Sequence, residues 1–146
     1  MTGEVLLTIR GIQEEIGEDA ATEIMTMARY YEKNGKHYFL YDEPVPEQSA
    51  VISNTVKLSE GRVDVIRRGG GMNVHMFFEQ GRPCSTLYVT GVGELTMDIE
   101  TESVKLTVSE QQIEALVHYQ FSMNGTWISG SSVRITAKAG TKGGYV

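Results

Sequence analysis

The chain has 146 residues, which fits one domain in which roughly 68–70% of the unfolded surface can be buried. Thirteen basic residues against nineteen acidic ones give a net charge of −6, which disfavours nonspecific binding to nucleic acid or anionic lipid. Residues 1–4 lack the basic and apolar regions of a signal peptide, and no apolar run approaches the roughly 20 residues that span a bilayer. The single cysteine, Cys84, cannot form an internal disulfide. We therefore expect a cytoplasmic protein with no nucleic-acid partner and no membrane partner.

The amino-terminal segments predict strands, with one ambiguity. Val5–Ile12 alternates apolar and polar residues, as a half-buried strand does. Residues 20–31 place apolar side chains at helical spacing, and Asp19 could cap a helix there. However, Asn34-Gly35 is a strong hairpin signal and needs residues 24–33 as a partner strand. We favour the strand.

Residues 43–46, Glu-Pro-Val-Pro, are expected to form a surface loop, because proline cannot donate to a ladder. Three alternating runs then follow between residues 50 and 78. Two-residue turns at Glu60-Gly61 and Gly69-Gly70 predict a register in which the same inner side chains satisfy both pairings. The inner pairs are Leu58–Val63, Val56–Val65, Asn54–Arg67, Val65–Val74 and Val63–Met76, and the outer row is Lys57–Asp64–His75.

The carboxy-terminal half predicts further hairpins. After a turn at residues 80–83, Ser85–Thr101 reads as one long strand with a bend at Gly91 and Gly93. A tight turn is expected at Thr101-Glu102 and a last hairpin at Asn124-Gly125. The apolar phase slips between residues 128 and 133, which predicts a β-bulge within Ser129–Ser132. Residues 139–146 are expected to be a flexible tail.

About ten strands joined by short hairpins predict an all-β fold. A single up-and-down antiparallel β-barrel of about 8–10 strands is the economical arrangement, because closure removes exposed edges. One domain spans residues 1–146, with an ordered core from about residue 4 to residue 138.

Four segments resemble one family of small bacterial proteins, the YwiB-like family. They are residues 30–36 (YYEKNGK), 54–61 (NTVKLSEG), 65–69 (VIRRG) and 87–95 (LYVTGVGEL), and the similarity runs from about Val5 to Ala137. The resemblance implies a calycin-like, lipocalin-type barrel and a strand over residues 23–33. The family is a domain of unknown function, so it implies no activity and no site residues. The triple glycine at residues 69–71 departs from the family pattern.

Motifs of common catalytic and metal sites are missing from the sequence. The triple glycine is not followed by a helix or by Gly-Lys-Ser/Thr, so a hairpin turn is favoured over a phosphate loop. His37, His75 and His118 lie on different strands without metal-site spacing, and no serine lies in a nucleophile elbow. We predict no catalytic residues, no metal and no cofactor.

Asn54 and Arg67 are the strongest candidates for a site. The register turns both inward, among Val and Leu, and an unpaired buried guanidinium is costly. One interpretation puts the pair in water at the barrel mouth. The other makes Arg67 an anion anchor with Asn54 orienting the ligand, and with Tyr88 or Tyr119 lining the wall.

These residues lead to two main hypotheses. The first is a non-enzymatic barrel that binds a small, mostly apolar molecule carrying an anionic group. The alternative is a structural or interaction protein, monomer or homodimer, with a filled barrel and an outer patch at Ile66, Phe77 and Val92. A hydrolase or isomerase is third, because the register places no His, Asp or Glu inside the barrel.

Overall fold

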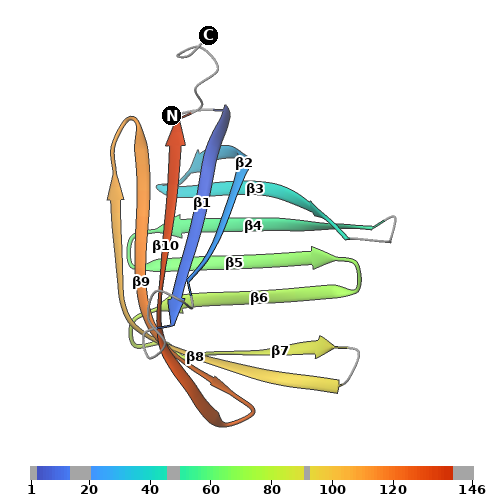
Figure 1. The fold of residues 1–146 in the computed structure, drawn as a ribbon. Helices are drawn as coiled ribbons and strands as arrows, with labels where there is room; N and C mark the ends of the chain where they lie inside the picture. Colours follow the sequence, from blue (N-terminus) through green and yellow to red (C-terminus); the bar gives the residue numbers. More distant parts are fainter. Residues whose placement is uncertain (1–2, 14–20, 46–49, 91–92, 140–146) are drawn as a thin grey trace.

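The computed structural model describes residues 3–13, 21–45, 50–90 and 93–139, with the side chains of residues 88–90 left out. These residues form ten strands and no helix (Figure 1). The strands are β1 (Gly3–Gln13), β2 (Thr22–Lys33), β3 (Lys36–Pro44), β4 (Val51–Ser59), β5 (Arg62–Gly69), β6 (Met72–Glu79), β7 (Cys84–Thr90), β8 (Gly93–Val108), β9 (Gln112–Met123) and β10 (Thr126–Ala139). Within these ranges, no helix has the length and apolarity that a membrane crossing requires.

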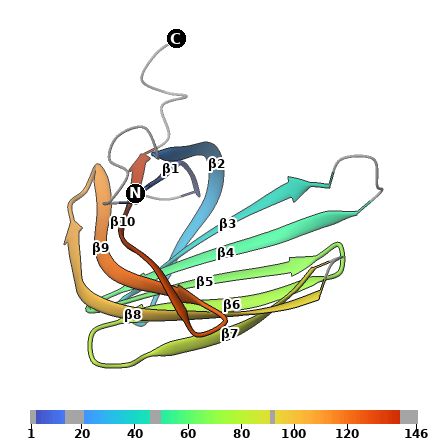
Figure 2. The ribbon, with the colours of Figure 1, turned by 60° about the horizontal axis from the view of Figure 1, so that its bottom comes forward.

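The ten strands make one antiparallel sheet that curls into a nearly closed barrel (Figures 1 and 2). Its order is β6-β5-β4-β3-β2-β1-β10-β9-β8-β7, so consecutive strands are neighbours and β1 pairs with β10. The two ends of the sheet, β6 and β7, are joined by a turn and by an isolated bridge between Glu79 and Arg82. This arrangement confirms the all-β barrel that the sequence predicts.

The Asn34-Gly35 hairpin settles the ambiguity over residues 24–33. Both turn residues have positive φ, 54° and 76°, as a type I′ turn requires, and Lys33 faces Lys36 across it. The segment before the turn is therefore strand β2, as the hairpin signal indicated. The helical spacing of its apolar residues was misleading, because several of these apolar side chains are exposed on β2 and do not pack in the core.

The predicted register is correct for β4 with β5 and wrong by two residues for β5 with β6. Leu58 faces Val63 and Asn54 faces Arg67, as expected. However, Val65 faces Met76 rather than Val74. A shift of two residues keeps every side chain on its predicted face.

The triple glycine is the physical reason for this shift. The turn is Gly70-Gly71, whereas Gly69 belongs to β5 and pairs with Met72. Gly69 has φ of 120° and lies so close to β4 that an added Cβ would clash with the carbonyl oxygen of Val51. A three-residue glycine run does not reveal which two residues form the turn.

Two predicted features around β8 are wrong. Residues 85–101 are not one bent strand, because β7 and β8 form a hairpin in which Thr90 faces Gly93; Gly91 itself lies outside the described residues. No tight turn occurs at Thr101-Glu102, where the pairing of β8 with β9 shifts by one residue instead. A bulge and a turn both interrupt the apolar phase, so the pattern alone could not separate them.

Smaller corrections concern β3 and β10. β3 continues to Pro44, which pairs with Val51, so the predicted loop begins later than expected. The bulge in β10 exists but lies at Ile128, between Trp127 and Ser129, just before the predicted range. β10 extends to Ala139, which faces Val5, and the rest of the predicted tail, residues 140–146, lies outside the described residues.

All ten strands contribute side chains to the barrel core. From β7, the core includes Cys84. Its largest fully buried members are Phe39, Leu7, Leu58, Ile113, Ile135, Val5, Val56, Val63 and Val117. Burying each such side chain contributes about 1.5–3 kcal/mol.

Candidate functional site

Arg67, Asn54 and Glu43 form one polar cluster on the inner face of β3, β4 and β5. Arg67 Nε donates to Asn54 Oδ1 at 2.9 Å, and Arg67 Nη2 lies 2.7 Å from Glu43 Oε1. Asn54 Nδ2 donates to the same carboxylate oxygen at 3.3 Å and to the Ile52 carbonyl at 3.4 Å. Asn54 is only 2% exposed, whereas the side chains of Arg67 and Glu43 are 29% and 46% exposed.

The expectation that no acidic or histidine side chain lies on the inner face was wrong. Glu43 supplies the anion that Arg67 needs, and the neighbouring Tyr41 packs against the core. Burial raises the pKa of the Tyr41 phenol, with Arg67 acting in the opposite direction. His37 is also buried on this face, where its Nδ1 lies 2.7 Å from the Tyr30 hydroxyl. The Arg67 guanidinium therefore has hydrogen-bond partners and is also partly exposed to water. Its environment is intermediate between those of the two predicted interpretations.

Tyr119 lines a separate pocket of about 360 Å³ at the carboxyl end of β1. The described lining residues come from β1, β2, β9 and β10: Gly11, Ile12, Gln13, Thr22, Tyr119, Phe121 and Ser131. Tyr119, Phe121 and Ser131 lie on the inner face, because each is two or four residues along its strand from the inner-face residue Val117 or Val133. The pocket combines aromatic, aliphatic and hydroxyl groups and carries no charge on these seven residues.

Tyr119 lies next to buried hydroxyl side chains of β8 and β10. Tyr119 is hydrogen-bonded to Ser131, whose Oγ lies 3.0 Å from Ser129 Oγ. Burial raises the pKa of the Tyr119 phenol, partly offset by the Ser131 hydrogen bond, so the phenol is neutral at pH 7. Thr101 faces Tyr119 across the β8–β9 ladder, and its buried Oγ1 has no hydrogen-bond partner in the described structure. Unsatisfied buried hydroxyls are rare in native proteins and need an explanation.

Of the predicted site residues, Asn54 and Arg67 contact each other, whereas Tyr119 lies apart from them. Tyr119 contacts Phe78, with ring centroids 5.0 Å apart, whereas Arg67 faces Val74 on the same strand β6. Four residues of strand separate these positions by about 13 Å. Tyr88 lies in β7 opposite Leu95, and its side chain lies outside the described residues.

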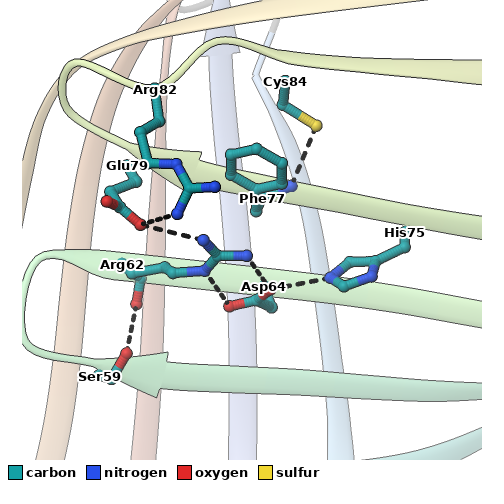
Figure 3. Close-up of polar contacts among 8 residues, drawn as sticks. All are labelled: Ser59, Arg62, Asp64, His75, Phe77, Glu79, Arg82 and Cys84. Carbon is teal, nitrogen blue, oxygen red and sulfur yellow. Dashed lines mark hydrogen bonds and ion pairs between the residues drawn. The ribbon is translucent and has the colours of Figure 1, made fainter.

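A third polar cluster lies on the outer face of β5 and β6 (Figure 3). Arg62 holds Asp64 by two parallel bonds, Nε to Oδ1 at 2.9 Å and Nη2 to Oδ2 at 3.0 Å, and reaches Glu79 at 3.0 Å. His75 Nε2 approaches Asp64 Oδ2 at 2.8 Å, diagonally across the ladder, because the register shift sets Phe77 directly opposite. The predicted outer row thus keeps its Asp64–His75 contact.

The cluster is built to hold a buried carboxylate. Asp64 is 4% exposed, and burial raises its pKa, but the hydrogen bonds from Arg62 and His75 outweigh burial and hold the pKa below its ordinary value. The hydrogen bond to Asp64 raises the pKa of Arg62 against the effect of burial. With both carboxylate oxygens engaged, the cluster supports strand pairing rather than a reaction.

Phe77 lies beneath this cluster and does not form the predicted exposed patch. The guanidinium carbon of Arg62 is 4.4 Å from the ring centroid and that of Arg82 is 5.7 Å from it. The ring also packs against the core, and the Phe77 amide donates to Cys84 Sγ at 3.4 Å. Val92 lies outside the described residues.

Sequence reasoning found Tyr119 and missed most of the pocket around it. Gly11, Thr22 and Ser131 are small or polar residues at inner-face positions, where apolar side chains would fill the barrel. That departure from the inner apolar phase was the available signal. Glu43 was missed because its proline neighbour argued for a loop.

Comparison with known proteins identifies a family of unknown function. The model of the domain of unknown function DUF1934 matches residues 7–135. Among solved structures, the ywiB protein from Bacillus subtilis is similar, with a TM-score of 0.76 and 25% identity, over 95% of this chain and 93% of that one. No curated protein matches the chain. Since the family model covers most of the sequence, this protein belongs to the DUF1934 family.

Proposed function

We propose that this protein binds a small, mostly apolar molecule inside its barrel, in the pocket beside Tyr119. The observation that carries the proposal is the pocket itself, about 360 Å³ among Tyr119, Phe121 and Ser131. That volume lies within the roughly 300–1,000 Å³ of known small-molecule sites, which combine apolar walls with a few polar groups. Barrels of similar strand number hold single small ligands in the same way.

The pocket favours a ligand whose polar group is uncharged. The Tyr119 phenol and the Ser131 hydroxyl can each exchange hydrogen bonds with a hydroxyl or amide. An anionic ligand at Asn54 and Arg67 is the second form of the proposal, and it requires displacement of the Glu43 carboxylate from the guanidinium.

Two fluorescent probes distinguish these forms. N-phenyl-1-naphthylamine is neutral and apolar, whereas 1-anilinonaphthalene-8-sulfonate has a similar aromatic body and an anionic sulfonate. We expect the neutral probe to bind saturably at one site. Tighter binding of the sulfonate probe, lost in Arg67→Met, would instead place the ligand at Arg67. If neither probe binds saturably, the proposal is wrong.

Gly11 offers a pocket-filling variant with a matched control. A Cβ at Gly11 would lie 3.5 Å from Thr22 Oγ1, an ordinary contact, so the backbone accepts a side chain there. Gly11→Leu should occupy the pocket and weaken the neutral probe at least about tenfold, whereas Gly11→Ala should bind nearly as wild type. Equal binding by the leucine variant, with an unchanged melting temperature, would exclude this pocket.

A further inference from the structure

The amino-terminal half of β2 has a backbone edge that no other described strand covers. β1 pairs with β2 from Thr22 to Tyr30, whereas β3 pairs only with Arg29–Lys33. Beyond that point β3 diverges from β2, as Figure 2 shows. Residues 22–28 therefore present unpaired backbone groups on the side away from β1, which is a template for a further strand.

This edge lacks the usual protection against strand pairing. Its sequence, TEIMTMA, contains no proline and no lysine, and one charged residue, Glu23. Ile24, Met25 and Met27 are 51%, 60% and 49% exposed. An exposed apolar strand edge of this kind marks an interaction site.

We propose that β2 pairs with β2 of a second copy of this chain, antiparallel, about a two-fold axis at Met25. In this register Met25 faces the partner's Met25, and Thr22 faces the partner's Ala28. All seven unpaired residues are used, and pairing stops where β3 begins to pair with β2. Every pair also joins side chains on the same face, as an antiparallel ladder requires.

The charges of β2 favour its own copy over another partner. Glu23 would face the partner's Met27 and lie diagonal to the partner's Arg29, and the two-fold axis repeats that contact at the other end. Diagonal cross-strand neighbours lie about 7–8 Å apart, within reach of long side chains. Both residues already face side chains of opposite charge on β1. Each end of the interface would therefore extend a row of alternating positive and negative side chains. Between the ends, the methionines of both copies would cover one another.

Sedimentation equilibrium of the full chain tests the interface. We expect a reversible dimer for the wild type. Met25→Lys sets two ammonium groups face to face and should weaken the dimer at least about tenfold. Val108→Lys changes another exposed apolar side chain, 52% exposed on β8, and should leave the dimer intact.

Cysteine cross-linking tests the register. Met25→Cys places two thiols directly opposite each other and should give a disulfide-linked dimer on mild oxidation. Met27→Cys faces Glu23 of the partner and should cross-link far less. Cys84 is buried and can remain in both variants. A wild type that is monomeric at its highest soluble concentration, a dimer unaffected by Met25→Lys, or equal cross-linking at both positions would overturn the proposal. None of these outcomes depends on the ligand pocket.

Discussion

Asp64 shows how a single outward-facing carboxylate can be buried in this barrel. Its strand neighbours on the inner face are the fully buried Val63 and the partly buried Val65, yet Asp64 itself is covered by Arg62, His75 and Phe77 on the outer face. A bidentate guanidinium–carboxylate pair is among the stronger side-chain interactions. Because the pair lies beside the end of the sheet at β6, it stabilises the strand that has no ladder partner on its other side.

We predict that Asp64→Asn lowers the free energy of unfolding by about 1–3 kcal/mol at neutral pH. The folded-state pKa of Asp64 is depressed, so its contribution is complete above the unfolded value near 3.9 and is lost as pH falls through the folded value. Urea unfolding should therefore show a constant difference between wild type and variant above about pH 5 and a narrowing one below about pH 4. The control is Asp42→Asn on the exposed face of β3, for which we expect almost no difference.

The same residues show what the sequence could reveal at this scale. The outward placement of Asp64 and the inward placement of Asn54 and Arg67 follow from period-two alternation, and both are observed. The partners of these groups were harder to predict. Arg62 reaches along its own strand to Asp64, and Glu43 of β3 reaches across β4 to Arg67 of β5, so reasoning from directly paired strands finds neither contact.

At the scale of the elements, turns decided which predictions succeeded. Asn-Gly pairs require positive φ at both residues, so the hairpins at Asn34-Gly35 and Asn124-Gly125 were predicted at their exact positions. The turn of the hairpin between β7 and β8 was instead predicted at Thr101-Glu102. A β-bulge occurs there, and a bulge shifts the alternation of apolar residues in the same way as a turn does. The predicted number of strands was right although one hairpin was misplaced.

The triple glycine supplies a sharp test at this scale. We predict that Gly69→Ala destabilises the protein by about 3 kcal/mol or more, because its Cβ would clash with the Val51 carbonyl in a positive-φ conformation. Gly71→Ala meets no neighbouring atom and should cost only about 1 kcal/mol for its positive φ. Thermal or urea unfolding of both variants measures the difference. Equal destabilisation would contradict the assignment of the turn to Gly70-Gly71.

At the scale of the whole molecule, strand count and hairpin lengths were enough to predict a barrel. They were not enough to predict its interior, since whether inner side chains fill the space depends on their volumes at each level of the barrel. The pocket lies where Gly11, Thr22 and Ser131 stand at inner positions. The unpaired edge of β2 could not be predicted from the sequence of β2 either, because it depends on where β3 diverges from β2.

Backbone NMR of the isotope-labelled protein, titrated with N-phenyl-1-naphthylamine, tests the interior-binding claim most directly. We predict shift changes that saturate at one probe per chain and centre on Gly11, Thr22, Tyr119 and Ser131. Changes centred on Met25 and Met27 would show that the probe covers the β2 edge instead. That result, or a spectrum that the probe does not change, would contradict ligand binding inside the barrel.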